Sequence, residues 1–368
     1  MALWLVLEWY GAASEVPWLF LLAAWMLALM LATFSYSAWN RAGLRLHLEA
    51  RESRSAADSP ADALPENLLR SAPWSAPVFE GDGLALEVGL TTTGAPRGPA
   101  WVTGLVGGRP ITFGTGVVPR DGWRRLEVLH KLRRGPIGAT GWQLGASDPL
   151  GFFNSVRSCP DVEVAVVLPT FTSLAPARQP RELEASVAAP RAGSGNELFG
   201  IREYRPGDSL RRIHWRSSAR HGELVVREYE PPGMRTLAIL VDPSPRSVEV
   251  ADQVARLAAS EAWDCIREGG RVSLWAPGLE PTEPAQGRDL WALLEWLARY
   301  PAVPSGDLAD ASPRAGEVVM VTATANRTLI DAVELAKQRG AGVRAWVVGD
   351  AEVDLDAPVR RVGIAWPL

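Results

Sequence analysis

A long stretch without charges near the start of the chain limits what the first forty residues can form. Between Val16 and Asn40 there are 25 residues, and none of them is charged. About 20 apolar residues in a helix span the hydrocarbon core of a bilayer. Trp18 and Trp39 stand near the two ends, where aromatic residues gather in membrane proteins. We therefore predict one membrane helix over residues 17–39, within an anchor segment covering residues 1–42.

The distribution of arginine around this helix predicts its orientation. No basic residue precedes the span. The arginines that follow it closely are Arg41, Arg45, Arg51 and Arg54. The positive-inside rule then places the bulk of the chain in the cytoplasm, attached to the cell inner membrane. A cleaved signal peptide is the alternative, but the span lacks a basic leader and is longer than usual for one. Ala2–Leu7 is apolar and too short to cross, so it predicts at most a short second element.

Composition excludes few classes of protein. The chain of 368 residues is long enough for two folded domains besides the anchor, and its net charge of −4 gives no reason to expect nucleic acid. Cys159 and Cys265 lie far apart without the spacing of metal ligands, which favours two free thiols. Only two of the 38 basic residues are lysine, so arginine richness is general here and weakens the meaning of each single arginine.

The region after the anchor predicts an antiparallel β domain over residues 43–170. Short apolar runs alternate with turn sequences rich in Gly and Pro, which is typical of a β-sandwich. The predicted strands cover residues 83–90, 101–106, 111–118, 124–132, 139–147 and 162–169. The run AADSPADALPEN reads as a linker within the polar approach to this domain. Asp148 begins the sequence DPLG, which we interpret as a turn rather than a catalytic aspartate. Residues 171–194 are predicted to be a second linker.

The last third of the chain, residues 237–368, alternates strands and helices. Nearly continuous apolar runs are predicted as strands at 237–242, 271–276, 316–324, 343–348 and 359–366. Amphipathic segments are predicted as helices at 248–268, 288–300 and 327–339. This pattern indicates a parallel sheet covered on both faces. In such α/β folds, ligands bind at the carboxyl ends of the strands.

An arginine-rich segment, residues 195–236, stands between these two regions. Between Gly200 and Arg220 six arginines face only two acids. The residues that we single out as an interaction surface or structural network are Arg202, Tyr204, Asp208, Arg211, Trp215 and Arg220. Arginine presents a planar fork to phosphate or carboxylate, so an anion-binding surface is one interpretation. An internal network of Arg with Asp and Glu is the other.

Local structure within this segment follows from turn and helix signals. Pro206 and Gly207 predict a turn, and Asp208 can cap a short helix over Ser209–Ser218. We expect Ile213 and Trp215 to pack inward from that helix. Leu224 and Val226 then predict the buried side of a strand.

The same segment resembles the signature of the domain-of-unknown-function-58 family. The matching run reads F-x-G-x-R-x-Y-x-P-G-D-x-x-R-x-I-x-W-x-x-S-A-R-x-G-x-L-x-V-R-E-x-E, from Phe199 to Glu230. The motifs at Arg133–Gly138 and Ser147–Phe153 resemble landmarks of that family's middle domain. The resemblance implies a bacterial membrane-anchored protein with a von Willebrand factor A-like (vWA-like) domain of Rossmann type, an immunoglobulin-like sandwich, and partnership with a MoxR-type AAA+ ATPase. It implies no enzymatic activity.

A vWA-like domain raises the question of a metal ion. Such domains bind Mg²⁺ through D-x-S-x-S, and here Asp242 and Ser244 match while Arg246 replaces the second serine. Thr322 lies where relatives place a further metal-site residue, within Thr-Ala-Thr rather than T-D-G. We interpret Asp242, Ser244 and Thr322 as a degenerate site and predict no bound cofactor.

No set of residues in the sequence has the spacing of a catalytic nucleophile and base, a P-loop or a zinc site. We therefore expect a non-enzymatic, membrane-tethered assembly or scaffold factor that cooperates with a MoxR-type AAA+ ATPase. An envelope protein that binds anionic ligands or polymers through the arginine-rich segment is one alternative. A cation-dependent adhesion module is another.

Overall fold

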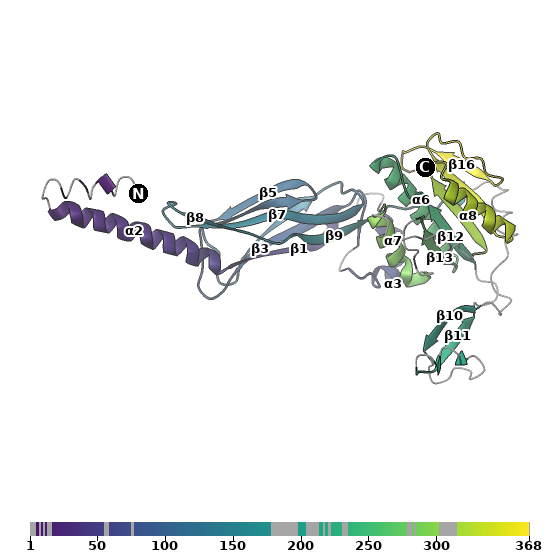
Figure 1. Cartoon of the computed structure of the whole chain (residues 1–368), viewed down its shortest axis with the longest axis horizontal. Coiled ribbons are helices and arrows are strands. Elements are labelled where there is room, and N and C mark those ends of the chain that lie inside the picture. Colours follow the sequence, from purple (N-terminus) through teal and green to yellow (C-terminus); the bar gives the residue numbers. More distant parts are fainter. Residues whose placement is uncertain are drawn as a thin grey trace. The chain divides into compact units, whose positions relative to one another are not determined.

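The fold divides into two compact units (Figure 1). The computed structural model describes residues 17–54, 59–74, 77–177, 198–203, 213–215, 218–219, 222–229, 235–277, 282, 285–301 and 315–367, together with Leu5, Val6, Trp9 and Ala12. Unit 1 comprises Met1–Arg54, Asp82–Leu132 and Pro136–Val166, and unit 2 comprises Ser55–Gly81, Arg133–Gly135 and Val167–Leu368. The predicted β domain ran without a break over residues 43–170, whereas unit 1 leaves out residues 55–81, 133–135 and 167–170.

The uncharged stretch forms one continuous helix, α2, over Pro17–Ala42. Among the residues that the structure describes, it is the one helix long and apolar enough to cross a membrane. This confirms the predicted apolar helix, which by length and composition fits a membrane anchor or a signal sequence. The short apolar stretch Ala2–Leu7 falls largely outside the described residues.

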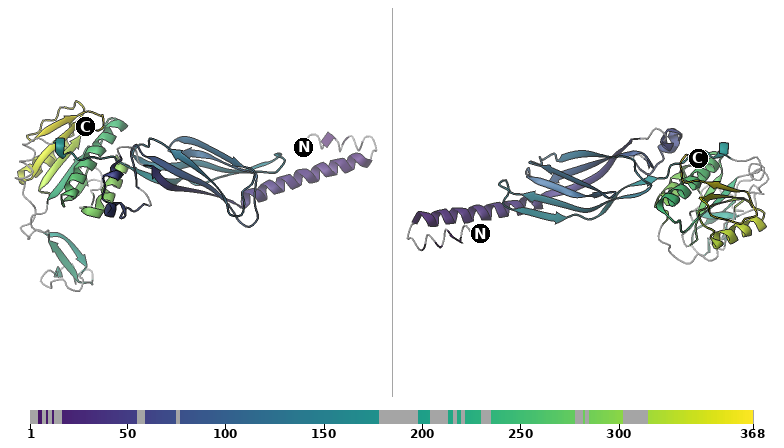
Figure 2. Two further views of the ribbon diagram at one scale, coloured as in Figure 1. Left: turned by 180° about the vertical axis from the view of Figure 1, so that it is seen from behind. Right: turned by 90° about the horizontal axis from the view of Figure 1, so that it is seen from above.

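The last turns of α2 are fixed to the strands of unit 1 by the side chain of Asn40, which is fully buried. Its Nδ2 donates to the carbonyls of Pro99, at 3.1 Å, and Ser147, at 3.0 Å, and its Oδ1 accepts from the Gly98 N–H at 2.8 Å. The guanidinium of Arg97 lies 3.3 Å from the centre of the Trp39 ring and donates to the Trp39 carbonyl. In both views of Figure 2, α2 leaves from one end of these strands.

Unit 1 is built from antiparallel strands in two sheets. One sheet has the order β1-β3-β6 and the other contains the order β9-β7-β4-β5, with β8 paired to β7. The strands are β1 (Leu44–Arg54), β3 (Gly83–Thr92), β4 (Ala100–Val106), β5 (Arg109–Thr115), β6 (Trp123–Leu129), β7 (Gly135–Ser147), β8 (Asn154–Ser158) and β9 (Val162–Leu168). The six predicted strands are present. Strands β1 and β8 were not predicted, because β1 was read as part of a polar approach.

Two tryptophans of unit 1 lie flat over glycines on neighbouring strands. A Cβ atom at Gly104 would stand 2.5 Å from the Trp142 ring, and one at Gly145 would stand 2.1 Å from the Trp101 ring. Trp142 is 1% exposed, and its indole N–H donates to the Leu105 carbonyl at 3.2 Å. Glycine is required at both positions because the rings occupy the space of any side chain.

Unit 2 contains a parallel sheet of five strands in the order β13-β12-β14-β15-β16. The elements are β12 (Thr236–Val241), α6 (Val248–Arg267), β13 (Arg271–Trp275), α7 (Leu290–Arg299), β14 (Glu317–Thr322), α8 (Arg327–Gln338), β15 (Gly342–Val348) and β16 (Val359–Val362). Each predicted strand and helix of residues 237–368 is present within a few residues. The strand order is one of the two common orders of doubly wound, Rossmann-like α/β folds.

The two faces of this sheet are covered by different helices. Val343, Ala345 and Val347 of β15 form one core with Leu329 and Val333 of α8. Successive side chains of a strand point to opposite faces, so Arg344 and Trp346 face the other side. There both donate to the carboxylate of Glu261 on α6, Arg344 through Nη2 at 2.6 Å and Trp346 through its indole N–H at 2.8 Å.

The residues between strands β1 and β3 belong to unit 2, and their described part is packed. They form the short helices η1 (Pro60–Asp62) and α3 (Glu66–Leu69) and the strand β2 (Val78–Phe79), which pairs in parallel with the end of β9. The indole N–H of Trp291 in α7 donates to the Leu68 carbonyl at 3.1 Å. The predicted linker AADSPADALPEN is therefore wrong for its described part, because buried leucines hold this segment against α7.

The first residues of the second predicted linker are also fixed. The ring of Phe171 lies 5.6 Å from the Trp263 ring of α6 and is tilted by 45° to it. Leu174, which is 1% exposed, donates its N–H to Asp264 at 2.9 Å. A short helix, η2 (Ala175–Ala177), follows. The linker prediction is therefore wrong for residues 171–177, and residues 178–194 lie outside the described part of the chain.

Arg134 holds the two helices α6 and α7 together within unit 2. Its side chain is 4% exposed and pairs with Asp252 of α6 at 2.9 Å. It also donates to the carbonyls of Leu297, Ala298 and Tyr300 at the end of α7. Those carbonyls have no partner inside the helix, so a cation there satisfies them and complements the helix dipole. The neighbouring Arg133 pairs with the same aspartate but is 56% exposed.

Replacing Arg134 by alanine should destabilise unit 2 strongly. Breaking a buried ion pair by removing one partner costs roughly 3–5 kcal/mol. In a unit of this size that lowers the thermal midpoint by roughly 10 °C. The measurement is thermal unfolding of the full chain in detergent, followed by circular dichroism. Arg133→Ala is the matched control and should cost about 1 kcal/mol or less, since exposed pairs contribute little. Equal midpoints for the two variants would contradict this assignment.

Candidate functional site

The carboxyl edge of the parallel sheet places Asp242 at the point where the strand order reverses. Asp242 follows β12, and Thr322 ends the neighbouring strand β14. Between these two strands the chain connections leave in opposite directions, and doubly wound folds bind ligands in the crevice that this creates. The structure therefore brings Asp242 and Thr322 together, as the degenerate metal site required.

The carboxylate of Asp242 is fully buried and has at least three donors from the protein. Its Oδ1 accepts from the Ser244 N–H at 2.9 Å. Its Oδ2 accepts from the Ala323 N–H at 2.9 Å and the Thr324 hydroxyl at 2.8 Å. The Thr322 hydroxyl lies 3.0 Å from the same oxygen and 2.6 Å from the Thr324 carbonyl, to which its one hydrogen can also be donated. An ionised carboxylate offers about four lone-pair sites. Most of its acceptor capacity is thus used inside the protein.

The backbone of Asp242 and its neighbouring residues give further evidence about this site. The Tyr300 hydroxyl donates to the Asp242 backbone carbonyl, and burial raises the pKa of that hydroxyl well above its ordinary value. Arg246, which replaces the second serine of the metal motif, is exposed. Within the described part of the chain, no three His, Cys, Asp or Glu residues lie where they could hold a metal together. We interpret this edge as a hydrogen-bonded turn that holds β12 to β14.

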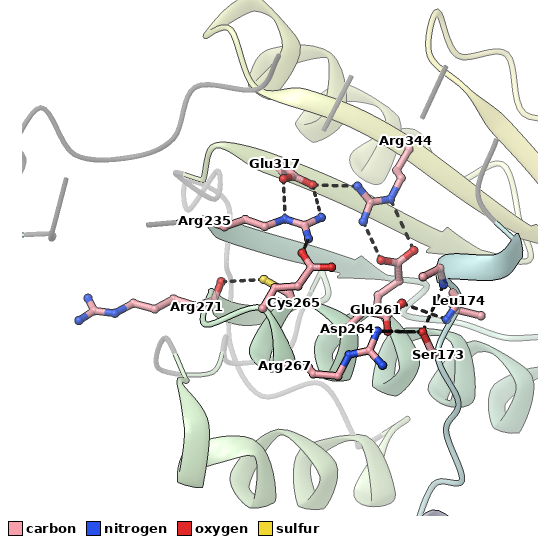
Figure 3. Close-up of polar contacts among 12 residues, drawn as sticks. Ser173, Leu174, Arg235, Glu261, Asp264, Cys265, Arg267, Arg271, Glu317 and Arg344 are labelled. Atoms are coloured by element: carbon pink, nitrogen blue, oxygen red, sulfur yellow. Dashed lines mark hydrogen bonds and ion pairs between the residues drawn. The ribbon is translucent and has the colours of Figure 1, made fainter. Parts of the chain in front are cut away.

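A second group of buried charges lies near the amino ends of the strands, as Figure 3 shows. Glu317, the first residue of β14, accepts from Arg235 at 2.6 and 2.7 Å and from Arg344 at 2.9 Å. Arg235 also pairs with Glu268, and Arg344 with Glu261. Each carboxylate thus has an arginine partner within the protein. The edge opposite to the usual ligand crevice carries this network, which favours a structural role.

Cys265 and Asp264 beside this network are also engaged. Burial raises the pKa of the Cys265 thiol to about 12, and its sulfur lies 3.8 Å from the Arg271 carbonyl. A thiol with so high a pKa is a poor nucleophile, because the thiolate is the reactive form. Asp264 is fully buried and accepts from the Ser173 hydroxyl at 2.8 Å. No local sequence pattern indicates these contacts, since the partners are distant along the chain.

The arginine-rich segment forms a two-stranded antiparallel hairpin of β10 (Leu198–Glu203) and β11 (Val225–Tyr229). Ile213 bridges to Val226, and both are buried. The Ser218 hydroxyl accepts from the Val225 N–H at 2.9 Å, and the His214 N–H donates to the Val225 carbonyl at 2.8 Å. These bonds hold His214 and Ser218 against β11, and the Ser218 N–H also donates to the His214 carbonyl at 3.0 Å. The helix predicted over Ser209–Ser218 is wrong at Ile213, which lies in a bridge.

Trp215 lies on the outside of this hairpin. Its side chain is 66% exposed, although we expected it to pack inward with Ile213. Leu224 is 44% exposed as well, whereas Val225 and Val226 are both buried. The inward prediction for Trp215 is therefore wrong: Ile213 is buried at its bridge to Val226, whereas Trp215 is exposed to solvent. Of the other residues singled out, only the backbone of Arg202 in β10 is described, and Tyr204, Asp208, Arg211 and Arg220 lie outside the described residues.

Neither the addition of Mg²⁺ nor its removal should change the stability of unit 2. A ligand that binds only the folded state raises the thermal midpoint, and the carboxylate of Asp242 is already satisfied by protein donors. The measurement is the midpoint with millimolar Mg²⁺ and with EDTA. Asp242→Asn should lower the midpoint equally in both, through a loss of roughly 1–3 kcal/mol. Stabilisation of the wild type by Mg²⁺ that Asp242→Asn abolishes would establish a metal site.

Glu317 should make the stability of unit 2 depend on pH. Burial alone would raise the pKa of its carboxyl, but pairing with Arg235 and Arg344 outweighs this and holds the pKa below its ordinary value. A lowered carboxyl pKa stabilises the fold above the unfolded pKa, and that contribution is lost as pH falls through the folded pKa. The stability gap between wild type and Glu317→Gln should be roughly 3–5 kcal/mol at neutral pH and shrink in acid.

The control for this pH series is Glu295→Gln, which removes an exposed pair with Arg299 on α7. It should follow the wild type at every pH, because exposed pairs of this spacing contribute only about 0.5 kcal/mol. A gap between wild type and Glu317→Gln that stays constant from neutral to acid pH would refute the role of its ionisation.

The chain is similar to other proteins over part of its length. An uncharacterized protein, YeaD, of Bacillus subtilis (strain 168) is 29% identical over 115 residues. That match covers 31% of this chain and 28% of the relative, so the two share only about a third of their lengths. Among solved structures, the exo-chitosanase CsxA of Amycolatopsis orientalis with PNP-β-D-glucosamine covers 82% of this chain and 32% of its own, at 11% identity. The TM-score of 0.21 is too low to indicate a shared fold.

A family model matches residues 200–355, which run from the hairpin through β15 of the parallel sheet. This region contains the arginine-rich signature, Asp242 and most of the buried charge network. The model is that of the family described as protein of unknown function DUF58, which this chain resembles over these residues.

Proposed function

We propose that this chain is a membrane-tethered, non-enzymatic docking protein. In this proposal α2 is an anchor in the cell inner membrane, and the bulk of the chain lies in the cytoplasm. Unit 1 is an immunoglobulin-like β-sandwich that supports the anchor, and unit 2 is a vWA-like domain whose hairpin binds a protein partner. The single observation that carries the proposal is the exposed tryptophan on an otherwise well-bonded hairpin.

The junction at Asn40 supports an anchor over a cleaved signal sequence. Cleavage after the apolar stretch would remove the side chain that satisfies the Gly98 N–H and the carbonyls of Pro99 and Ser147. Leaving buried backbone groups without partners costs roughly 1–3 kcal/mol each. The fold therefore favours retention of the helix, and the arginines that follow it favour a cytoplasmic orientation.

The hairpin supports docking because tryptophan is unusual on a free surface. Trp is enriched at the centres of protein interfaces, where it contributes a large part of the binding energy. Ser218 and Ile213 are held against β11 on either side of Trp215, so the side chain is positioned before any partner arrives. Leu224 adds apolar surface on the same short segment. A pre-organised aromatic residue loses little conformational freedom on binding.

The rest of unit 2 supports a binding role over catalysis. The buried carboxylates of Asp242, Glu261, Glu317 and Asp264 all accept from groups of the protein, so their polarity is used to hold the fold. The family resemblance implies a MoxR-type AAA+ ATPase as the partner. We extend the proposal to such an ATPase, which would dock on the hairpin and act on a further client.

Trp215→Ala should abolish capture of this partner. The experiment is a crosslinked pull-down of the full chain from native membranes in mild detergent with nucleotide, read by mass spectrometry. Wild type should recover an AAA+ ATPase, and the variant should recover at least tenfold less of it. A hot-spot tryptophan contributes roughly 2 kcal/mol or more to binding. Leu335→Ala, on an exposed apolar side chain of α8, is the matched control and should retain the partner.

Both variants must melt at the temperature of the wild type before the pull-down is interpreted. Recovery of the same partners by a folded Trp215→Ala protein would remove the hairpin from the proposal. Recovery of no ATPase by the wild type would remove the partner itself.

A further inference from the structure

A short loop of unit 1 lies beside the end of the apolar helix and has a fixed shape. It joins β7 to β8 and runs from Asp148 to Phe153. The Asp148 carboxylate accepts from the Leu150 N–H at 2.8 Å and the Phe153 N–H at 2.6 Å. Gly151 adopts a φ of 76° and donates its N–H to the Asp148 carbonyl at 3.1 Å. These bonds tie both carboxylate oxygens and the carbonyl of one buried aspartate to the loop, so the loop is held as a rigid turn.

Two large apolar side chains of this loop face outward. Leu150 is 58% exposed and Phe152 is 62% exposed. Single exposed apolar residues are common on protein surfaces. Here, however, a bonded turn with a buried aspartate displays two of them within three residues. A rigid turn of this kind presents them at a defined place rather than leaving them free to fold back.

The loop is joined to α2 near the end of its apolar stretch. The ring of Phe153 meets the ring of Phe34 edge to face, with 5.6 Å between centroids. Arg41 donates to the carbonyl of Val156 at 3.1 Å, and the backbone at Ser147 accepts from Asn40. These contacts place the loop alongside the segment of α2 between Phe34 and Arg41. Figure 1 shows β8 at the α2 end of the strands.

The depth of that segment in a membrane follows from helix geometry, on the proposed function in which α2 is a membrane anchor. A hydrocarbon core of about 30 Å takes about 20 helical residues. Counted from Trp18, the core then ends near Ser37, between Phe34 and the first charge at Arg41. Seven residues separate Phe34 from Arg41, which is about 10 Å along a helix axis. The loop therefore lies at the boundary between acyl chains and headgroups.

Charge around the loop fits the same boundary. Arg41 and Arg157 each use one N–H on a backbone carbonyl, those of Val156 and Leu44 respectively. Both side chains carry further N–H groups that can meet lipid phosphates, and basic residues next to a membrane helix attract anionic headgroups. An apolar tip flanked by arginines is the arrangement found in segments that lie in the interface.

We propose that the loop Asp148–Phe153 is a second membrane contact, which inserts Leu150 and Phe152 into the bilayer interface beside the end of α2. The occupant of this apolar surface is the lipid bilayer. The contact would hold unit 1 against the membrane at two points, the helix and the loop. A tilt of unit 1 about the end of α2 would then be opposed by withdrawal of these side chains from lipid.

The test measures the depth of single probes in the full chain reconstituted in nanodiscs. Cys159→Ser removes the more accessible native thiol, since Cys265 is buried. An environment-sensitive fluorophore is then attached to one new cysteine at a time. Phe152→Cys reports on the loop, and Leu29→Cys, at a lipid-facing position of α2 that is 45% exposed, reports on the anchor. Spin-labelled phospholipids quench probes that contact the acyl chains.

Leu105→Cys is the matched control on unit 1. Leu105 is 41% exposed and lies six residues along the chain from Pro99, about 20 Å further from the end of α2 at the rise of a strand. The probe at residue 152 should show a blue-shifted emission and be quenched by spin-labelled lipid several-fold more than the probe at 105. Each labelled protein must keep the thermal midpoint of the unlabelled chain.

The outcomes separate this inference from the proposed function. Quenching at 29 without quenching at 152 overturns the inference and leaves the anchor in place. No quenching at either position overturns the anchor as well. A blue shift at 152 without quenching by lipid means that protein, such as a second copy of the chain, covers the loop, and this also overturns the inference. Quenching at both 29 and 152 with none at 105 supports it.

Discussion

The hydrogen bonds of Asn40 are the constraint on which the first half of the structure depends. One amide side chain donates to two carbonyls and accepts from one N–H, and these three partners come from the residues just before β4 and from the end of β7. An amide buried at such a point is stable only when its donors and acceptor are all used. The helix therefore enters the strands at one rotation and one height. A leucine at this position would also be buried, but it would fix neither the rotation nor the height of the helix.

Unit 2 uses its charges in the same way, to define positions. The parallel sheet has polar side chains at both the carboxyl and the amino ends of its strands. In both sets the polar groups bond to other groups of the protein. At the carboxyl edge, two backbone N–H groups and the Thr324 hydroxyl donate to the Asp242 carboxylate. At the other edge, two arginines and two glutamates alternate. Open α/β sheets that bind ligands leave such groups free toward the crevice. The interior of this unit is stabilised at those points instead, and its surface is left for recognition.

The sequence predicted the elements of unit 2 well because their periods are clear. Helices α6 and α8 begin and end within one residue of the prediction, and each has a side chain at its N-cap, Ser247 and Asn326. The apolar helix was equally readable. Strand β1 was missed although Leu44, Leu46 and Leu48 alternate with polar residues, since the many charges there suggested a solvated approach. Alternation of apolar and polar residues is weak evidence for a strand when the polar residues are charged.

The candidate site was less predictable, for physical reasons. Asp242 and Thr322 could be placed at one edge because strand ends converge there, but the donors that fill the carboxylate come from the backbone and from Thr324. The burial of Ile213 beside the exposed Trp215 involves a bridge between residues 13 positions apart. The role of Arg134 depends on partners 118 to 166 residues away, and no local pattern carries that information. Contacts of such separation are specified only by the completed fold.

That separation has a consequence for how the protein is made. A ribosome delivers residues 59–81 and Arg134 long before α6 and α7, whose side chains and carbonyls complete their packing. Through much of synthesis these early segments of unit 2 therefore lack the helices against which they pack. A nascent chain stalled before Asp252 would expose the apolar residues of α3 and β2 to chaperones.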